Sequence, residues 1–373
     1  NYGQHLDDEF TFKIQVKEAN DLLAIFAPGL KVSNGTNLTG HYRARTADFN
    51  ARLISDLLVY NKMDFNHLRL KQTMTADSIN IEYHVDQFKY NDSLAFDDLY
   101  FRTSGGQNDL SSEFTWDQET PNASSIAWVT HVHNVNDFRF IIEPSYFSIK
   151  ERRWEIPDAS NISMRHDTIE VKRFLLKRDH QEVNLSGKIS KHDEDKLKFE
   201  IKNFRLSEIS EFLSESFKYS GELNSSGYIS SPYTNFKHSG TAHILGFHID
   251  KQEIGDLLVN SKWNGKRKSI GLNGNLMYKG LRNFDFEGSY YVEKETENLD
   301  FNLVFDKTDI EFTNAFLDPD LIDNVRGFLN GKVAVSGTPD KPILHGEIEI
   351  DEGSAKVELL GTELGFAGPV LVR

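Results

Sequence analysis

The chain has 373 residues, and 38% of them are hydrophobic, which is ordinary for a globular protein and excludes wholesale disorder. Its 57 acidic residues outnumber its 42 basic ones, and the formal charge of -15 argues against nucleic-acid binding and against electrostatic docking on anionic lipid. Because the sequence has no cysteine, disulfides, cysteine-type zinc sites, iron–sulfur clusters and thiol catalysis are excluded.

Alternation of apolar and polar residues runs along most of the chain and predicts strands with one apolar and one wet face. The pattern is typical of antiparallel sheets rather than buried parallel ones. In chain order it covers residues 12–16, 79–85, 197–201, 270–272, 301–305 and 348–350. The sequence therefore predicts an all-β fold.

Three short segments carry helical signals. Asn20 precedes an apolar run that Pro28 and Gly29 end, and Ser207 can cap a segment that reaches Phe217. Residues 318–328 combine a capping Asp318 with Pro319 at the first helical position, which predicts a helix of two or three turns.

Two stretches of the sequence resemble each other at a distance of 106 residues. Six identities follow when Gly221 is set against Gly327, and a helical segment precedes each copy. Such repetition is typical of elongated domains whose units touch only their neighbours. We expect one continuous rod with an N-terminal segment over residues 1–205, a repeat unit over 206–312 and a second, truncated unit over 313–373.

The run from Gly331 to Phe366 resembles the characteristic block of the TamB-like family, within the AsmA-like group of bridge-like envelope proteins. The likeness lies in a strand that ends in Ser-Gly-Thr-Pro at residues 336–339, in Pro-Ile-Leu-His-Gly at residues 342–346, and in two alternating strands around them. Upstream, residues 143–147 and Trp154 are similar to TamB-like proteins of Bacteroidetes. We expect an internal or C-terminal-half fragment of a longer protein from that group.

The resemblance implies a specific architecture and role. The twisted sheet would fold into an open U-shaped groove, the β-taco, in the periplasm of a Gram-negative bacterium, with the full-length protein anchored in the inner membrane. Its groove would carry phospholipid acyl chains between the inner and outer membranes. A TamA-like outer-membrane barrel would be its partner, with a role in the assembly or translocation of outer-membrane proteins, and nascent outer-membrane proteins are further candidate partners.

The candidate groove-lining residues are apolar side chains that share a strand face. They are Ile270, Leu272, Phe301, Leu303, Phe305, Val333, Val335, Leu344, Ile348, Ile350, Val357 and Leu359. Ordinary packing in a closed core explains any single one of them about as well.

No catalytic motif or cofactor site is expected, so the chain is interpreted as a non-enzyme. His131 and His133 share a strand face, but no third metal ligand is identifiable, and a solvated pair is the preferred interpretation. Two other functions stay open. One is a closed β-sandwich or solenoid that binds glycan or acts as an adhesin, and the other is a chaperone groove for nascent barrel strands.

Overall fold

The computed structural model describes residues 8–91, 94–106, 108–213, 217–339, 341–366 and 368–372. Strands account for 70% of the residues and helices for 7%, so the predicted all-β class is confirmed. The contacts between residues divide the chain into two compact units. Unit 1 is Asn1–Arg178 and unit 2 is Asp179–Arg373.

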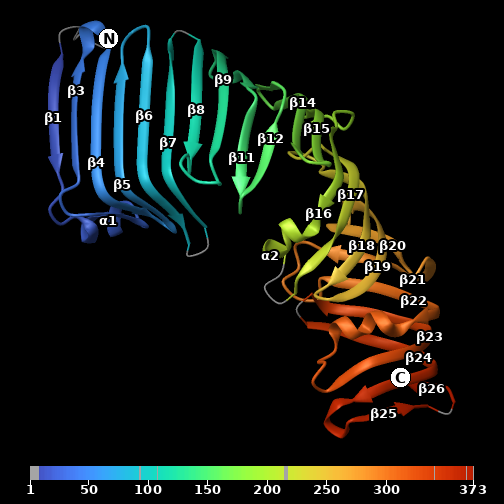
Figure 1. The fold of residues 1–373 in the computed structure, drawn as a ribbon. Coiled ribbons are helices and arrows are strands. Elements are labelled where there is room, and N and C mark those ends of the chain that lie inside the picture. The colour runs from blue at the N-terminus through green and yellow to red at the C-terminus, as the bar shows by residue number, and fades with distance from the viewer. Residues whose placement is uncertain are drawn as a thin grey trace. The chain divides into compact units, whose positions relative to one another are not determined.

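Unit 1 is an antiparallel meander, and most of its long strands lie side by side in chain order, blue to green in Figure 1. Its helices are α1 (Asn20–Phe26) and the 3₁₀ helix η1 (Ala44–Thr46). Its strands are β1 (Glu9–Gln15), β2 (Leu30–Val32), β3 (Asn37–Arg43), β4 (Asp48–Tyr60), β5 (Met63–Met74), β6 (Ile79–Tyr90), β7 (Leu94–Gly106), β8 (Asp109–Trp116), β9 (Ser124–Asn134), β10 (Asp137–Ile142), β11 (Ser145–Ile149), β12 (Arg152–Ile156), β13 (Ser160–Arg165) and β14 (Thr168–Arg178).

Proline interrupts the meander of unit 1 at two places. Strands β10 and β11 both pair with β9 and are separated at Pro144, while β12 and β13 both pair with β14 and are separated at Pro157. Proline has no backbone N–H and cannot donate a ladder hydrogen bond, so each long strand is broken there. The four short strands are thus two interrupted long ones.

Aromatic rings form a row across one face of unit 1. Tyr83 lies directly opposite Phe101, which lies opposite Phe114, and the ring centroids are 5.7 and 6.4 Å apart. Val85, two residues from Tyr83 and on the same face, is only 1% exposed. Because side chains alternate along a strand, the polar residues between these positions lie on the opposite face.

Unit 2 continues the same scheme, from β15 to β24 in chain order, yellow-green to red in Figure 1. Its helical segments are η2 (Leu206–Glu208), α2 (Ser210–Leu213), η3 (Ile310–Phe316) and η4 (Glu358–Leu360). Its strands are β15 (Gln181–Ile189), β16 (Leu197–Arg205), β17 (Tyr219–Ser230), β18 (Lys237–Ile249), β19 (Gln252–Asn264), β20 (Ser269–Tyr278), β21 (Leu281–Tyr291), β22 (Leu299–Asp309), β23 (Ile322–Thr338), β24 (Lys341–Val357), β25 (Thr362–Gly365) and β26 (Val370–Val372).

The predicted helices have different outcomes. The helix after Asn20 is confirmed as α1. The segment after Ser207 forms only η2 and α2, and residues 214–216 of that prediction lie outside the described residues. The helix predicted over residues 318–328 is wrong, because β23 begins at Ile322 and the helix of this region is η3, earlier in the chain.

The apolar core of unit 2 lies under η3. Ile310 is 5% exposed and packs with the buried Phe305 and Leu329. Phe312, also in η3, contacts a second cluster that contains Leu276, which is 1% exposed. The helix is stabilised by apolar contacts with strands of the sheet, including β20, which is distant in sequence.

The internal repeat has a backbone counterpart. Gly221 and Gly327 both have a φ of 129°. Asn224 and Asn330 each accept a hydrogen bond, through the side-chain oxygen, from a backbone N–H in the preceding strand, at 3.0 and 2.8 Å. Two β-bulges of the same construction therefore recur 106 residues apart. The domain boundaries predicted from the sequence, after residues 205 and 312, stay a prediction.

Candidate functional site

The register of unit 2 aligns apolar side chains in rows that run across the strands. One row joins Leu272, Gly288, Phe301, Val335 and Leu344, each residue directly opposite the next. Directly opposite residues point to the same side of a sheet, so the row forms part of a single face. We call this surface the apolar face of unit 2.

Most of the residues predicted from the sequence lie on this face. A second row places Leu303 opposite Val333, and a third places Phe305 opposite Gly331, which lies opposite Ile348. The predicted residues that share the face are Ile270, Leu272, Phe301, Leu303, Phe305, Val333, Val335, Leu344, Ile348 and Ile350. Four strands, β20, β22, β23 and β24, supply them.

The last two predicted residues lie beyond the register shifts near the end of β24. Val357 is the final residue of β24 and lies opposite Ile322. Leu359 is in the 3₁₀ helix η4 and is 85% exposed, so it shares no strand face with Val357. The strand alternation expected through residues 357–359 ends at the start of this helix.

The solvent exposure of the apolar face differs from one end to the other. Among the predicted residues, only Phe305 is buried, at 9% exposure, and it lies beneath η3. Leu344 is 64% exposed and the remaining members of the face are half-buried. The described residues of η3 therefore cover one end of the rows and leave the other side chains in partial contact with solvent.

Phenylalanine rings lie over glycines on this face. A Cβ placed on Gly274 would lie 2.7 Å from the ring of Phe286, its cross-strand neighbour. A Cβ on Gly288 would lie 2.5 Å from the ring of Phe301 on the next strand. Each ring thus occupies the space of the missing side chain, so the apolar face of unit 2 is lower at these positions. These pairs are not among the residues predicted from the sequence, although glycine at an apolar position of the alternation is their signal.

An ion cluster fixes the start of η3 against the sheet. Lys279 donates to Glu311 at 2.7 Å and to Asp309 at 3.3 Å, and the Tyr278 hydroxyl donates to Glu311 at 3.2 Å. The hydrogen bond from Lys279 holds the pKa of Glu311 below its usual range, and burial raises the pKa of Tyr278. The cluster is a positioning element for the helix that covers the end of the face.

One of the two histidines considered as metal ligands, His131, lies beside a carboxylate. His131 contacts Asp109 through Nδ1 at 2.6 Å and lies opposite Arg139. The neighbouring carboxylate orients the imidazole of His131 on a surface that also carries a guanidinium.

Comparison with known families decides the affiliation of the chain. The family model described as TamB, N-terminal domain, matches residues 5–350. The chain belongs to the TamB family. This TamB-family chain has no match among curated proteins or among solved structures.

The family assignment confirms the resemblance seen in the sequence and identifies an envelope protein. The matching model describes the N-terminal domain, whereas the sequence analysis expected an internal or C-terminal-half fragment. Origin in the Bacteroidetes stays a prediction. In the part of the chain that the structure describes, no helix has the length and apolar character needed to span a bilayer.

Proposed function

We propose that this TamB-family chain is a periplasmic segment whose apolar face in unit 2 binds phospholipid acyl chains and carries them between the inner and outer membranes. The role is that of a passive conduit without catalysis. The observation that carries the proposal is the continuous face, joined from β20 to β24 by the row of Leu272, Gly288, Phe301, Val335 and Leu344, with most of its side chains half-buried.

The physical need for such a face follows from the hydrophobic effect. A diacyl phospholipid has around 30 apolar CH₂ groups at roughly 0.8 kcal/mol each, so bare transfer into water costs on the order of 20 kcal/mol. Contact with half-buried apolar side chains along the path removes much of that cost. The flat Phe286 and Phe301 rings over glycines supply a smooth floor for a flexible chain.

A closed sandwich or solenoid that binds glycan or acts as an adhesin is less well supported. The interior of a closed sandwich would hold these side chains in full burial, as residues in a packed core are. Of the twelve predicted lining residues, only Phe305 reaches that state. We retain as part of the proposal that the full-length protein is anchored in the inner membrane and has a TamA-like barrel partner.

A second function is favoured by the outer edge of β24. In the described residues, β25 pairs with positions 354–357 and β26 with 348–350, so Lys341 to Gly346 have a partner strand on one side only. Such an edge offers backbone hydrogen bonds to an extended peptide. A role with nascent outer-membrane proteins would use this edge, and it is compatible with lipid binding on the face.

Site-specific crosslinking in cells tests the lipid proposal. A photo-crosslinking residue at Leu303 or Val335 points to the apolar face, while one at the adjacent Asn302 or Ala334 points to the opposite face. We expect phospholipid adducts at the first two positions and few at the other two. Equal capture at both pairs, together with absence of phospholipid in native mass spectra of the purified protein, would reject the conduit. Adducts with unfolded barrel proteins at residues 343–345 would identify the strand-addition role.

A further inference from the structure

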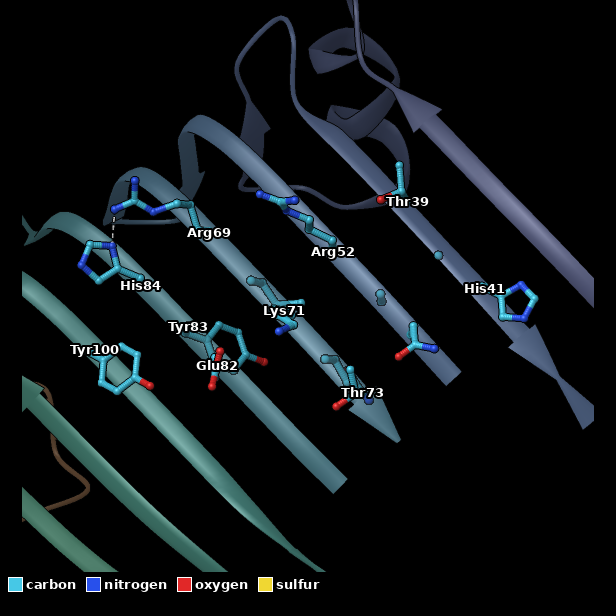
Figure 2. Close-up of a pocket in the computed structure, with 15 residues that line it drawn as sticks. Thr39, His41, Arg52, Arg69, Lys71, Thr73, Glu82, Tyr83, His84 and Tyr100 are labelled. Carbon is cyan, nitrogen blue, oxygen red and sulfur yellow. Dashed lines mark hydrogen bonds between the residues drawn. The ribbon is translucent and has the colours of Figure 1, made fainter. Parts of the chain in front are cut away.

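The polar face of unit 1 contains an open hollow of about 760 Å³, which Figure 2 shows in close-up. The side chains of Thr39, Arg52, Lys71 and Glu82 come from the consecutive strands β3, β4, β5 and β6, each directly opposite the next. Arg52 lies between Ala51 and Leu53 in sequence, so it points away from the face that carries the aromatic row. The hollow therefore lies on the face of unit 1 opposite the aromatic row.

Arg52 and Lys71 form an unusual pair. They lie directly opposite each other on β4 and β5, and among the register pairs described for unit 1 no other pair sets Lys or Arg against Lys or Arg. Like charges in this position repel, because directly opposite Cβ atoms are only about 4.5–5.5 Å apart. The free protein thus sets two like charges on neighbouring strands within the hollow.

Cations next to this pair are neutralised by carboxylates. Arg69 donates to Asp86 at 2.6 Å and also contacts His84, the bond drawn as a dashed line in Figure 2. Arg102 lies 3.9 Å from Glu82, which is thereby the one carboxylate of the hollow. Neither Arg52 nor Lys71 has an ion pair with any residue that the structure describes. Glu82 lies opposite Lys71 but is shared with Arg102, so positive charge exceeds negative charge in the hollow.

Hydrogen-bonding side chains surround the two cations. Asn50 lies opposite Thr73 in the neighbouring row, and Thr39 lies opposite Arg52. The side chains of Thr39, Asn50 and Thr73 have no hydrogen-bond partner in the described part of the chain and line the hollow. A guanidinium, an ammonium and neutral donors line one open space, and they match the oxygen atoms and the double charge of a phosphate group.

We propose that the hollow between β3 and β6 is a phosphate-binding site in which Arg52 and Lys71 are the principal ligands. A bound phosphate places negative charge between the two cations and converts their repulsion into attraction. The phosphate can belong to a soluble phosphate compound or to an anionic lipid headgroup, and the chemistry of recognition is the same for both.

Thermal unfolding of the protein in inorganic phosphate or pyrophosphate, against sodium chloride of equal ionic strength, tests the site. We expect the Tm to rise with the logarithm of phosphate concentration, as it does for a ligand that binds only the folded state. Lys71→Gln and Arg52→Gln should each weaken phosphate binding by at least about tenfold, the loss expected for one charge-assisted hydrogen bond. Lys198→Gln, an exposed lysine on β16, is the matched control and should respond like the wild type.

Arg52→Glu provides the decisive variant. The new carboxylate lies opposite Lys71 on one side and the neutral Thr39 on the other, so the repulsive pair becomes an attractive one. Its Tm without phosphate should exceed that of the wild type, and its phosphate response should disappear. No phosphate-dependent rise in the wild type, or an equal rise in Lys71→Gln, would overturn the proposal.

Flotation with vesicles of phosphatidylglycerol or phosphatidylcholine separates the two sources of phosphate. Binding to phosphatidylglycerol that free pyrophosphate displaces identifies a headgroup site, and phosphate binding without vesicle binding identifies a soluble ligand. Absence of both would overturn the site, while the crosslinking outcome on the apolar face of unit 2 is independent of it.

Discussion

Two leucines on the same face of β20 provide the sharpest measure of how open the apolar face of unit 2 is. Leu276 is 1% exposed and lies opposite Leu257 and Phe284, in the cluster that η3 covers. Leu272 is half-buried and lies opposite Ser261 and Gly288, which offer little surface. Both residues have the same strand and the same facing direction, so Leu→Ala changes intrinsic strand preference equally at the two positions.

The structure predicts unequal costs. Leu276→Ala removes buried methyl groups and leaves a cavity, which costs about 3–4 kcal/mol of unfolding free energy. Leu272→Ala removes side-chain surface that is partly in water and leaves an open notch rather than a cavity, at about 1 kcal/mol. The expected difference between the two variants is therefore roughly 2 kcal/mol or more.

Urea unfolding of the two variants, with the m-value checked against the wild type, measures this difference. Addition of phospholipid before unfolding should stabilise the wild type more than Leu272→Ala, if that leucine contacts acyl chains. Equal losses for both leucines would mean that a roof of packed side chains covers Leu272 as well, and the reasoning for an open face would be refuted.

Two other substitutions test features near the same face. Gly274→Ala should destabilise the folded protein by about 2 kcal/mol or more, because the new Cβ would overlap the Phe286 ring and the opposing backbone. Gly265→Ala is the control and should be nearly neutral, since a Cβ there has no neighbour closer than 3.5 Å. Equal melting temperatures of the two variants would contradict the close approach at Gly274. Glu311→Gln should cost about 1 kcal/mol near neutral pH, as expected for a partly exposed ion pair. Since the folded-state pKa of Glu311 is lowered below its ordinary value of 4.5, this contribution is present above that value and is lost as the pH falls through the folded-state pKa. Urea midpoints of the variant and the wild type should therefore converge in acid, and a pH-independent gap would argue against the ion pair.

Strand content could be predicted well from the sequence because alternation reports a local property, the two-sidedness of each strand. Residues 79–85 and 197–201 lie within β6 and β16. Ten of the candidate lining residues also lie on one face. They occupy alternate positions along neighbouring strands, and the register of those strands brings these positions to the same side of the sheet.

The position of η3 could not be predicted, because its deciding contacts are with strands of the sheet. Asp318 and Pro319 give a good start signal, yet Leu321 is 57% exposed and lies in neither apolar cluster. Asp309 caps η3 by accepting from the backbone N–H of Glu311, and Ile310 and Phe312 pack with Leu329 and Leu276 on the sheet. Tertiary packing outweighs the local capping preference, which is worth only about 1 kcal/mol.

The hollow around Arg52 and Lys71 was also invisible in the sequence. The two residues are separated by a strand and a turn, and only the register of β4 against β5 sets them opposite each other. A single cation on a wet strand face is ordinary, and it is the pairing that makes the position unusual.

The connectivity of the meander has a consequence for how the chain reaches its structure. Successive strands such as β4, β5 and β6 are joined by turns of a few residues, so each new strand finds a ready template in the one completed just before it. The entropy lost in closing such short loops is small, and no segment must wait for a distant portion of the chain. Assembly can thus advance from the N-terminus at the pace of synthesis, with each new strand added at the growing edge of the sheet.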